Sequence, residues 1–306
     1  MICVSIVIPV YNGSKTIQEL VAITKRVCND NNYRYEIILV NDGSADRSWD
    51  IIKELASQNE EIKGINLVKN YGQHTANLCG FRNSSYEYII TMDDDLQNPP
   101  TEIPRLIKKA TEGYDLVIGR FESKKHNILR RTGSIVIQLI NKSIFGIESN
   151  LVLSNFRCIH RSVIDSIVLR KHYRPYIPGL ILEHSFKRAN ITVKHSSRQY
   201  GTSNYTLVKI AKLTSDLLFN HSTIPLRLGA AIGFGATALC LLLSIALITY
   251  STIHEKKTPG WTSIMVLTSL NSSLILLMLS IIGEYIIRII KYTNEGVEYS
   301  IRDTAK

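Results

Sequence analysis

The five residues Asp93-Asp94-Asp95-Leu96-Gln97 bring three carboxylates and an amide together in one short stretch of the sequence. They follow the apolar run 88–92 and precede the pair Pro99-Pro100, a pattern that predicts a buried parallel strand ending at the acidic residues. Carboxylates this close repel one another, and a divalent cation removes that repulsion. Carboxylate and amide oxygens suit Mg²⁺ or Mn²⁺, which keep coordination positions for substrate phosphates. We therefore expect a metal at this strand end, with a solvated acidic turn as the alternative.

Apolar strand-like segments alternate with helical segments through the first part of the chain. Strands are predicted over residues 4–10, 35–40, 65–68, 88–92 and 114–119, and helices over residues 16–28, 46–58, 75–82 and 102–112. This alternation predicts an α/β fold with a mostly parallel, Rossmann-like sheet and right-handed crossovers.

A further acidic residue, Asp42, also follows a predicted strand. The carboxyl ends of parallel strands meet at one edge of a sheet, so Asp42 and the acidic run at 93–95 should converge there. A carboxylate can accept hydrogen bonds from a nucleoside, and a metal at Asp95 can hold phosphates. The soluble part contains no GxGxxG and no GxxxxGK[ST] pattern, which argues against a dehydrogenase and a P-loop NTPase. The pattern favours a nucleotide-diphosphate site without a glycine-rich loop.

Two long uncharged stretches, residues 228–253 and 258–283, follow the α/β part. Each exceeds the about 20 residues that cross a bilayer as a helix, so the sequence predicts a two-helix transmembrane hairpin with spans near 228–253 and 260–284. Buried helices of a soluble core are the alternative. We expect a catalytic domain over residues 1–206, a juxtamembrane amphipathic helix over 207–225, and the hairpin with its tail over 226–306.

The location of the domains follows from these spans. An even number of spans returns the tail to the side of the large domain, and no signal peptide precedes the first strand, so we expect the catalytic domain in the cytoplasm. Five cysteines without paired spacing fit a reducing compartment and argue against a zinc site. The net charge of +10 fits nucleic acid or an anionic membrane surface with phosphorylated substrates, and the two spans favour the membrane.

Three motifs, at residues 7–12, 41–44 and 93–100, resemble the signature segments of family 2 glycosyltransferases with a GT-A fold. The resemblance is greater still to the polyprenyl-phosphate glycosyltransferases, a group that includes dolichyl-phosphate mannose synthase. Within that group, the bacterial aminoarabinose transferases are most similar at the segment Lys69-Asn70-Tyr71-Gly72-Gln73-His74. Residues 283–289 are similar to the end of the second membrane span in the bacterial members. The resemblance covers nearly the whole chain.

The resemblance implies roles for individual residues. The nucleoside pocket would be lined by Pro9, Tyr11 and Asp42. Asp93 would hold the nucleotide or the metal, and Asp95 and Gln97 would bind the Mg²⁺ or Mn²⁺ that bridges the diphosphate. The acceptor phosphate would face Arg120, Arg130 and Ser134. The loop that closes over the diphosphate would contain Arg198, Tyr200, Gly201 and Ser203. Asp94 occupies a variable position and receives no direct role.

One residue departs from the family pattern. Many relatives carry Asp before a Phe-Arg pair, whereas this chain has Asn155 before Phe156-Arg157. Asn cannot act as a base. Either the step needs none, since a lipid monophosphate is already anionic near neutral pH, or Asp95 or another group serves.

The resemblance implies an inverting transfer of a sugar from a nucleotide sugar, with UDP as the expected nucleotide, to undecaprenyl phosphate. The reaction would take place at the cytoplasmic face of the bacterial inner membrane and feed lipopolysaccharide or O-antigen modification, and family members form tetramers. The sequence does not identify the sugar. A processive polysaccharide synthase is disfavoured because the Gln-x-x-Arg-Trp motif is missing. A non-catalytic nucleotide-binding membrane scaffold is the remaining alternative.

Overall fold

The computed structural model describes residues 1–121, 151–170, 175–194, 260–294 and 298–306, together with separate residues between 228 and 249. The chain divides into two compact units. One comprises Met1–Asn204 and Glu295–Lys306, and the other comprises Tyr205–Asn294.

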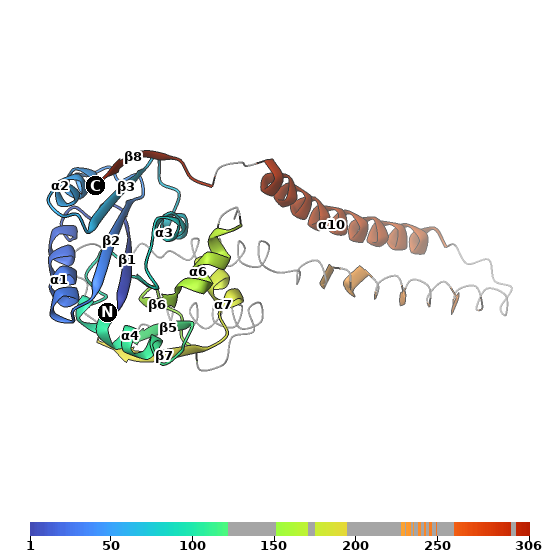
Figure 1. Cartoon of the computed structure of the whole chain (residues 1–306). Helices are drawn as coiled ribbons and strands as arrows, with labels where there is room; N and C mark the ends of the chain where they lie inside the picture. The colour runs from blue at the N-terminus through green and yellow to red at the C-terminus, as the bar shows by residue number, and fades with distance from the viewer. Residues whose placement is uncertain are drawn as a thin grey trace. The chain divides into compact units, whose positions relative to one another are not determined.

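The first unit is built on an eight-stranded sheet (Figure 1). Its strands are β1 (Cys3–Val10), β2 (Arg34–Asn41), β3 (Ile62–Leu67), β4 (Tyr88–Thr91), β5 (Leu116–Phe121), β6 (Arg157–His160), β7 (Arg188–Val193) and β8 (Ile301–Ala305). The strand order is β7-β5-β6-β4-β1-β2-β3-β8. The pairs β1–β2, β1–β4, β2–β3 and β5–β7 are parallel, whereas β6 and β8 run antiparallel to their neighbours. The predicted mostly parallel α/β sheet is confirmed.

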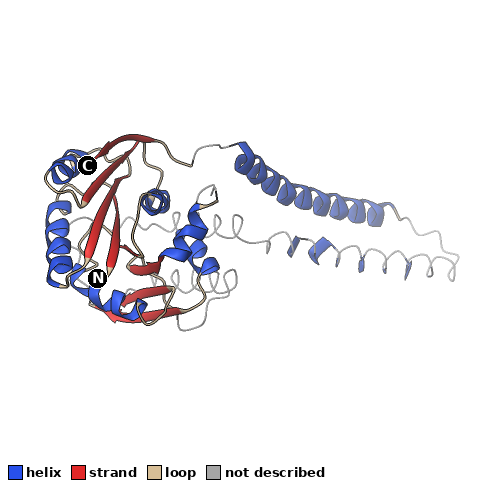
Figure 2. Ribbon diagram, viewed as in Figure 1, coloured by secondary structure: helices blue, strands red, loops and turns tan. Residues whose placement is uncertain are grey.

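Helices cover both faces of this sheet (Figure 2). They are α1 (Ile17–Asp30), α2 (Ser48–Ser57), α3 (Gln73–Arg82), α4 (Ile103–Ala110), α6 (Arg161–Val168) and α7 (Ile177–His184), with a short 3₁₀ helix, η1 (Pro100–Glu102), before α4. Side chains alternate between the faces along each strand, so the apolar strands supply two separate cores. This double burial explains why the parallel strands are nearly continuous runs of Val, Ile and Leu.

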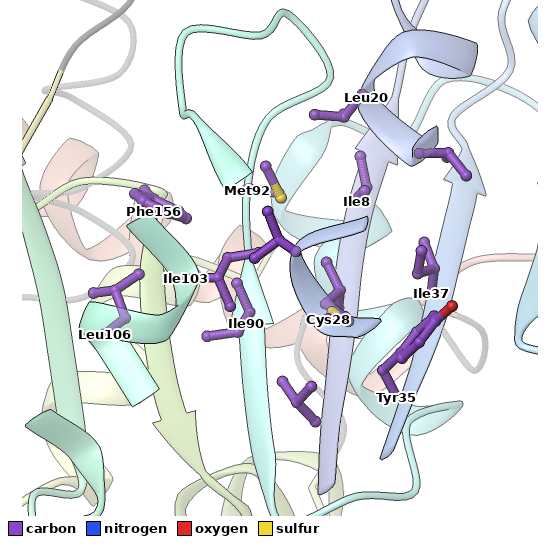
Figure 3. Close-up of a cluster of buried hydrophobic side chains, with 14 of the residues drawn as sticks. Ile8, Leu20, Cys28, Tyr35, Ile37, Ile90, Met92, Ile103, Leu106 and Phe156 are labelled. Carbon is purple, nitrogen blue, oxygen red and sulfur yellow. The ribbon is translucent and has the colours of Figure 1, made fainter. Parts of the chain in front are cut away.

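The first core lies between the sheet and helices α1, α2 and α4. Figure 3 shows Ile8, Ile37 and Ile90 on neighbouring strands, together with Cys28 of α1 and Ile103 of α4. All five side chains are fully buried. This packing holds β4, and therefore the acidic residues that follow it, firmly against β1.

The second core lies between the opposite face and helices α3, α6 and α7. Helix α3 approaches the sheet very closely at Gly80, where an added Cβ would meet Cγ1 of Val7 at 2.2 Å. A larger residue at this position would push α3 away from β1. The start of α3 is therefore held close to the carboxyl ends of the central strands.

The tail of the chain adds an edge strand that the sequence pattern did not indicate. Strand β8 pairs antiparallel with β3, with Gly64 opposite Ala305 and Asn66 opposite Asp303. We predicted residues after the second span only as a cytoplasmic tail. The segment has mixed polar and charged character and is exposed on β8, so no apolar alternation marks it as a strand.

The second unit contains α10 (Trp261–Asn294), which includes the predicted second span. Over Leu270–Ile287, α10 is sufficiently long and apolar to cross a membrane, and it is the one such helix found among the described residues. Gly229, near the start of the predicted first span, lies against α10, because an added Cβ would meet Met278 and Ile281 at about 3 Å. Most of the first span, and the amphipathic helix predicted at 207–225, lie outside the described residues.

Candidate active site

The acidic segments predicted to converge do lie at one edge of the sheet. Strands β4, β1 and β2 are adjacent and parallel, so their carboxyl ends meet at the same edge. Tyr11 follows β1, Asp42 follows β2, and the acidic run at 93–95 follows β4. Two further segments join them: the start of α3 and the residues just before β6.

Asp42 is a buried carboxylate that holds the loop before α3. Its Oδ1 accepts the backbone N–H of Tyr71 at 2.7 Å, and its Oδ2 accepts that of Gly72 at 2.9 Å. Burial raises the pKa of Asp42, and the two N–H donors partly offset that rise. The next residue, Gly43, has φ of +63° and lies directly against the backbone of Lys69. The contact of Asp42 with a nucleoside stays a prediction.

Pro9 and Tyr11, the other residues predicted to line the nucleoside pocket, lie at the same edge. Pro9 is buried within β1, and Tyr11 is 53% exposed just beyond that strand. The exposed ring of Tyr11 is available to a ligand, whereas Pro9 can act only through the backbone that it shapes.

Asp94 holds the loop after β1 against the acidic run. Its Oδ2 accepts the backbone N–H of Tyr11 at 3.1 Å, and an added Cβ at Gly13 would meet the same oxygen at 2.5 Å. Burial is the main cause that raises the pKa of Asp94 to about 7. The hydrogen bond from Tyr11 lowers this pKa, whereas the charges of Asp93 and Asp95 raise it further. Sequence reasoning gave Asp94 no direct role, and the structure gives it this loop contact.

Asp93 lies where α3 and the segment before β6 meet the acidic run. Asp93 Oδ1 accepts hydrogen bonds from two side-chain amides, that of Gln73 and that of Asn155. The bond from Asn155 is 3.3 Å long. Burial raises the pKa of Asp93, and the neighbouring Asp95 charge raises it further. Asn155, the residue that departs from the family pattern, therefore faces the acidic cluster as a hydrogen-bond donor.

Asp95 and Gln97 are presented by a tight turn. Asp95 Oδ1 accepts the backbone N–H of Gln97 at 3.2 Å, and Leu96 between them has φ of +60°. A left-handed conformation costs a non-glycine residue about 1–2 kcal/mol, and burial of the Leu96 side chain offsets that cost. The turn leaves Asp95 and Gln97 half-buried at the edge of the sheet.

The oxygen donors of this turn suit a hard divalent cation. Within the described ranges, no three His, Cys, Asp or Glu side chains are close enough together to form a metal site by themselves. Mg²⁺ is commonly held by one or two carboxylates, with substrate phosphates and water completing its shell. Asp93 and Asp95 offer two carboxylates; burial raises the pKa of Asp93, and the charge of Asp95 raises it further. Asp93, Asp95 and Gln97 would therefore suit an Mg²⁺ or Mn²⁺ ion, and such an ion would offer its remaining positions to phosphate oxygens.

Arg120 lies near the carboxyl end of β5, at the same edge of the sheet and two strands from β4. The register puts Ile118, Arg157 and Thr91 in one row across the sheet. Arg120, Asn155 and Asp93 each lie two residues further toward the same edge, so continuing this register sets them in a row there. At a strand spacing of about 4.8 Å, the Arg120 and Asp93 backbones lie about 10 Å apart. The Arg120 side chain is exposed, so an anion could reach it. The row therefore places a cation across Asn155 from the acidic run.

Arg157 entered the sequence analysis only as part of the Phe-Arg pair and received no role there. It is 1% exposed, and its Nε donates to the Thr91 hydroxyl at 3.1 Å. That hydroxyl donates in turn to the carbonyl of Asn155 at 2.6 Å. Burial lowers the pKa of Arg157 to about 10, while the charge of Asp93 acts in the opposite direction. An arginine inside the apolar run 156–159 was the available signal, because buried arginines need a partner.

Several predicted residues lie outside the described ranges. They are Arg130, Ser134, Arg198, Tyr200, Gly201 and Ser203. The predicted acceptor site and closing loop therefore rest on the family resemblance, with Arg120 as the described member of the acceptor set.

Comparison with known proteins agrees with the motifs. A family model described as "Glycosyl transferase family 2" matches residues 5–168. The chain is 38% identical to the undecaprenyl-phosphate 4-deoxy-4-formamido-L-arabinose transferase of Pseudomonas fluorescens (strain SBW25) over 80% of this chain and 72% of that protein. It is 33% identical to the enzyme of the same name from Photorhabdus laumondii over 98% of this chain and 93% of that protein. The resemblance to polyprenyl-phosphate glycosyltransferases is confirmed.

Solved structures share the fold at lower identity. Glucosyl-3-phosphoglycerate synthase from Mycobacterium tuberculosis, crystallised with phosphoglyceric acid, superposes with a TM-score of 0.52 and 18% identity, covering 71% of this chain and 77% of that one. A complex of the same synthase with Mn²⁺, UDP and phosphoglyceric acid gives a TM-score of 0.52 and 17% identity, covering 71% of this chain and 76% of that one. These likenesses confirm the GT-A fold.

Proposed function

Because the chain belongs to glycosyl transferase family 2 and is a glycosyltransferase, we propose that it transfers a sugar from a UDP-sugar to undecaprenyl phosphate. The transfer takes place at the cytoplasmic face of a bacterial inner membrane. The observation that carries the proposal is the acidic edge: Asp42 follows β2, Asp93 and Asp95 follow β4, and an exposed Arg120 lies at the same edge two strands from β4. The names of the relatives supply the acceptor, and they favour 4-deoxy-4-formamido-L-arabinose as the sugar.

The two ends of the row at the sheet edge suit the two substrates. A divalent cation held by Asp93, Asp95 and Gln97 would supply the positive charge that stabilises the departing nucleotide diphosphate. Arg120 would orient the acceptor phosphate, since guanidinium binds phosphate oxygens in a planar, bidentate way. The two anionic substrates need such cations to approach one another.

The acceptor chemistry explains why Asn155 suffices where relatives carry a carboxylate. A phosphate monoester is already anionic near neutral pH, so its oxygen attacks without first losing a proton to a strong base. Asn155 holds Asp93 through its amide and, unlike a carboxylate, adds no negative charge at this position. A single displacement in this arrangement inverts the anomeric carbon.

The membrane part of the proposal follows from the second unit. Helix α10 is long enough to span a bilayer, and its described residues are largely exposed between Leu270 and Ile287. Paired with the apolar stretch 228–253, it would form a two-span hairpin that keeps the catalytic unit beside the lipid acceptor. By family resemblance we also propose a homotetramer.

A turnover assay tests the proposal. Purified full-length protein in detergent is incubated with undecaprenyl phosphate, Mg²⁺ or Mn²⁺, and a panel of UDP- and GDP-sugars that includes 4-deoxy-4-formamido-L-arabinose donors. Mn²⁺ and UDP are included because a synthase of the same fold was crystallised with them. We expect a lipid-linked sugar from a UDP donor. No product from any donor would rule out the proposed function and leave a non-catalytic scaffold.

A matched pair of variants tests the metal ligands. We expect Asp95→Ala to abolish turnover while the protein keeps its thermal stability. Asp50→Asn removes an exposed carboxylate on α2, whose partner is Lys53 one turn away, and should leave turnover unchanged. Turnover that survives Asp95→Ala would show that the metal is bound elsewhere.

A further inference from the structure

The tail of the chain contacts two elements of the catalytic unit, helix α3 and strand β3. Glu298, whose side chain is 7% exposed, forms an ion pair with Arg82 at the end of α3. The Arg82 guanidinium also lies over the ring of Tyr299, 5.6 Å from its centroid. Strand β8 then pairs with β3. Residues 298–305 are therefore fixed to both the helix and the strand that flank one loop.

That loop, residues 68–72, runs from the end of β3 to the start of α3. Three hydrogen bonds join it to the tail. The Val68 N–H donates to the carbonyl of Ser300 at 2.9 Å, and the Arg302 guanidinium donates to the Val68 carbonyl at 3.0 Å. The Ser300 N–H donates to the Tyr71 hydroxyl at 3.3 Å. The tail thus contacts both ends of the loop.

The opposite side of the same loop rests on the nucleotide edge. The N–H groups of Tyr71 and Gly72 donate to the Asp42 carboxylate, and Gly43 lies against the Lys69 backbone. Tyr71 is therefore bound through its hydroxyl to the tail and through its N–H to Asp42. Only the length of one side chain separates the tail from the carboxylate that we expect to contact the nucleoside.

Apart from the tail and Asp42, the loop is held through Tyr71, which packs against the second core, and through the Gly72 carbonyl, which accepts N–H groups at the start of α3. Val68, Lys69 and Asn70 are exposed, and Gly72 has φ of +95° with no heavy atom within 4 Å of an added Cβ. Exposed segments with few apolar contacts open locally at low free-energy cost. Without the tail, the edge of β3 would also present unpaired backbone groups.

We propose that residues 298–305 are a positioning segment for the nucleotide site, with Tyr71 as the residue through which they act. The segment holds the loop in the place where Tyr71 and Gly72 bind Asp42, and this fixes the orientation of the Asp42 carboxylate toward a nucleoside. The proposal rests on the proposed function in one respect, that Asp42 belongs to the nucleotide site. A tail that served only to cover the sheet edge would change stability and leave nucleotide affinity alone.

Amide hydrogen exchange tests the mechanical part without any ligand. Tyr71→Phe keeps the ring and loses the bond from Ser300. In this variant we expect the backbone amides at positions 71 and 72 to exchange about tenfold faster than in wild type, while the amides of α1 exchange at the same rate. Tyr33→Phe removes a tyrosine hydroxyl just before β2, at the opposite end of that strand from Asp42; it is the matched control and should behave like wild type. Equal exchange of the loop in wild type and Tyr71→Phe would overturn the inference.

Calorimetric titration with UDP and Mn²⁺ tests the functional part. We expect the dissociation constant for UDP to rise about three- to tenfold in Tyr71→Phe and further in a chain lacking residues 298–306. A synthetic peptide of residues 298–306 should restore the affinity of the shortened chain. In turnover, the KM for the donor should rise while kcat changes little.

The outcomes separate the two proposals. If wild type binds UDP and Tyr71→Phe binds it equally well, the positioning role is wrong and the proposed function stands. If wild type binds no nucleotide while the loop amides of Tyr71→Phe exchange faster, the tail does hold the loop, and the assignment of this edge to a nucleotide is wrong.

Discussion

Gly43 is the position at which a single methyl group should damage the nucleotide edge most directly. Its φ of +63° lies in the left-handed region, which side chains other than glycine adopt at a cost. A Cβ built at Gly43 would lie 2.4 Å from the Lys69 carbonyl carbon and 2.5 Å from the Asn70 nitrogen. Both atoms belong to the backbone of the loop that Asp42 holds, so neither can rotate away as a side chain would.

The destabilisation has two parts. The left-handed backbone costs alanine about 1–2 kcal/mol. Relief of the overlap requires the Lys69–Asn70 backbone to move, and such overpacking costs about 1–3 kcal/mol. Gly113→Ala isolates the first part, because Gly113 has φ of +88° and no heavy atom within 4 Å of an added Cβ. The entropy that alanine removes from the unfolded chain is common to both variants and cancels. The difference between them should therefore be about 2 kcal/mol.

Thermal unfolding followed by circular dichroism measures this difference. For a domain of this size, about 2 kcal/mol corresponds to a Tm about 4–8 °C lower for Gly43→Ala than for Gly113→Ala. Binding of UDP to Gly43→Ala should also weaken, since the displaced loop carries the N–H groups that hold Asp42. Equal Tm values for the two variants would refute the reasoning, because the contact with Lys69 would then carry no energy.

Three further predictions concern charge. Asp46→Asn should lower stability by about 1 kcal/mol at pH 7, because Asp46 accepts N–H bonds from Ser48 and Ser14 at the start of α2. Burial opposes the ionisation of Asp46, but its bonds from the two serines outweigh burial and lower its pKa. The stabilisation from Asp46 is therefore fully present above the unfolded-state pKa of about 3.9 and is lost as the pH falls through the lower folded-state pKa. Unfolding measured at pH 7 and at pH 3 would detect this loss. Arg157→Met should reduce kcat about 10- to 100-fold, because it removes the charged hydrogen bond from Arg157 to the Thr91 hydroxyl, and Arg157→Lys should reduce kcat less. Equal kcat values for Arg157→Met and wild type would contradict this. Leu277→Arg in α10 should cost about 2.5–3.5 kcal/mol of membrane insertion and reduce the fraction that resists alkaline extraction; full retention would argue against a span.

The first half of the sheet was predictable because its signals are local. From β1 to β5, each strand is an apolar run bounded by turn residues, the first four are each followed by a helical segment, and the predicted segments lie close to the observed ones. Strand β6 was missed because it has four residues and contains the buried Arg157. Its place between β4 and β5 is set by antiparallel pairing across distant parts of the chain, which no local pattern encodes.

The candidate site divides in the same way. Convergence of Asp42 with the acidic run follows from strand order alone, and the structure brings the two together. The loop contacts of Asp94 and the charge of Arg157 behind Asp93 depend on which face each side chain takes. Side chains alternate along a strand, so a shift of one residue in the register of β4 would turn its side chains to the opposite face and move the acidic turn that follows it. The register of β4 against β1 decides that question, and only the folded structure supplies it.

The start of α3 connects the two acidic positions of the site. Three consecutive residues take part: Tyr71 and Gly72 donate to Asp42 through their backbone N–H groups, and Gln73 donates to Asp93 through its side chain. A displacement of this short segment therefore acts on both carboxylates at once. Since residues in one hydrogen-bond network are coupled, Asp42→Asn and Gln73→Ala should not have additive effects on donor affinity. Additive effects in a double-mutant cycle would mean that the nucleoside and metal ends of the site are held independently.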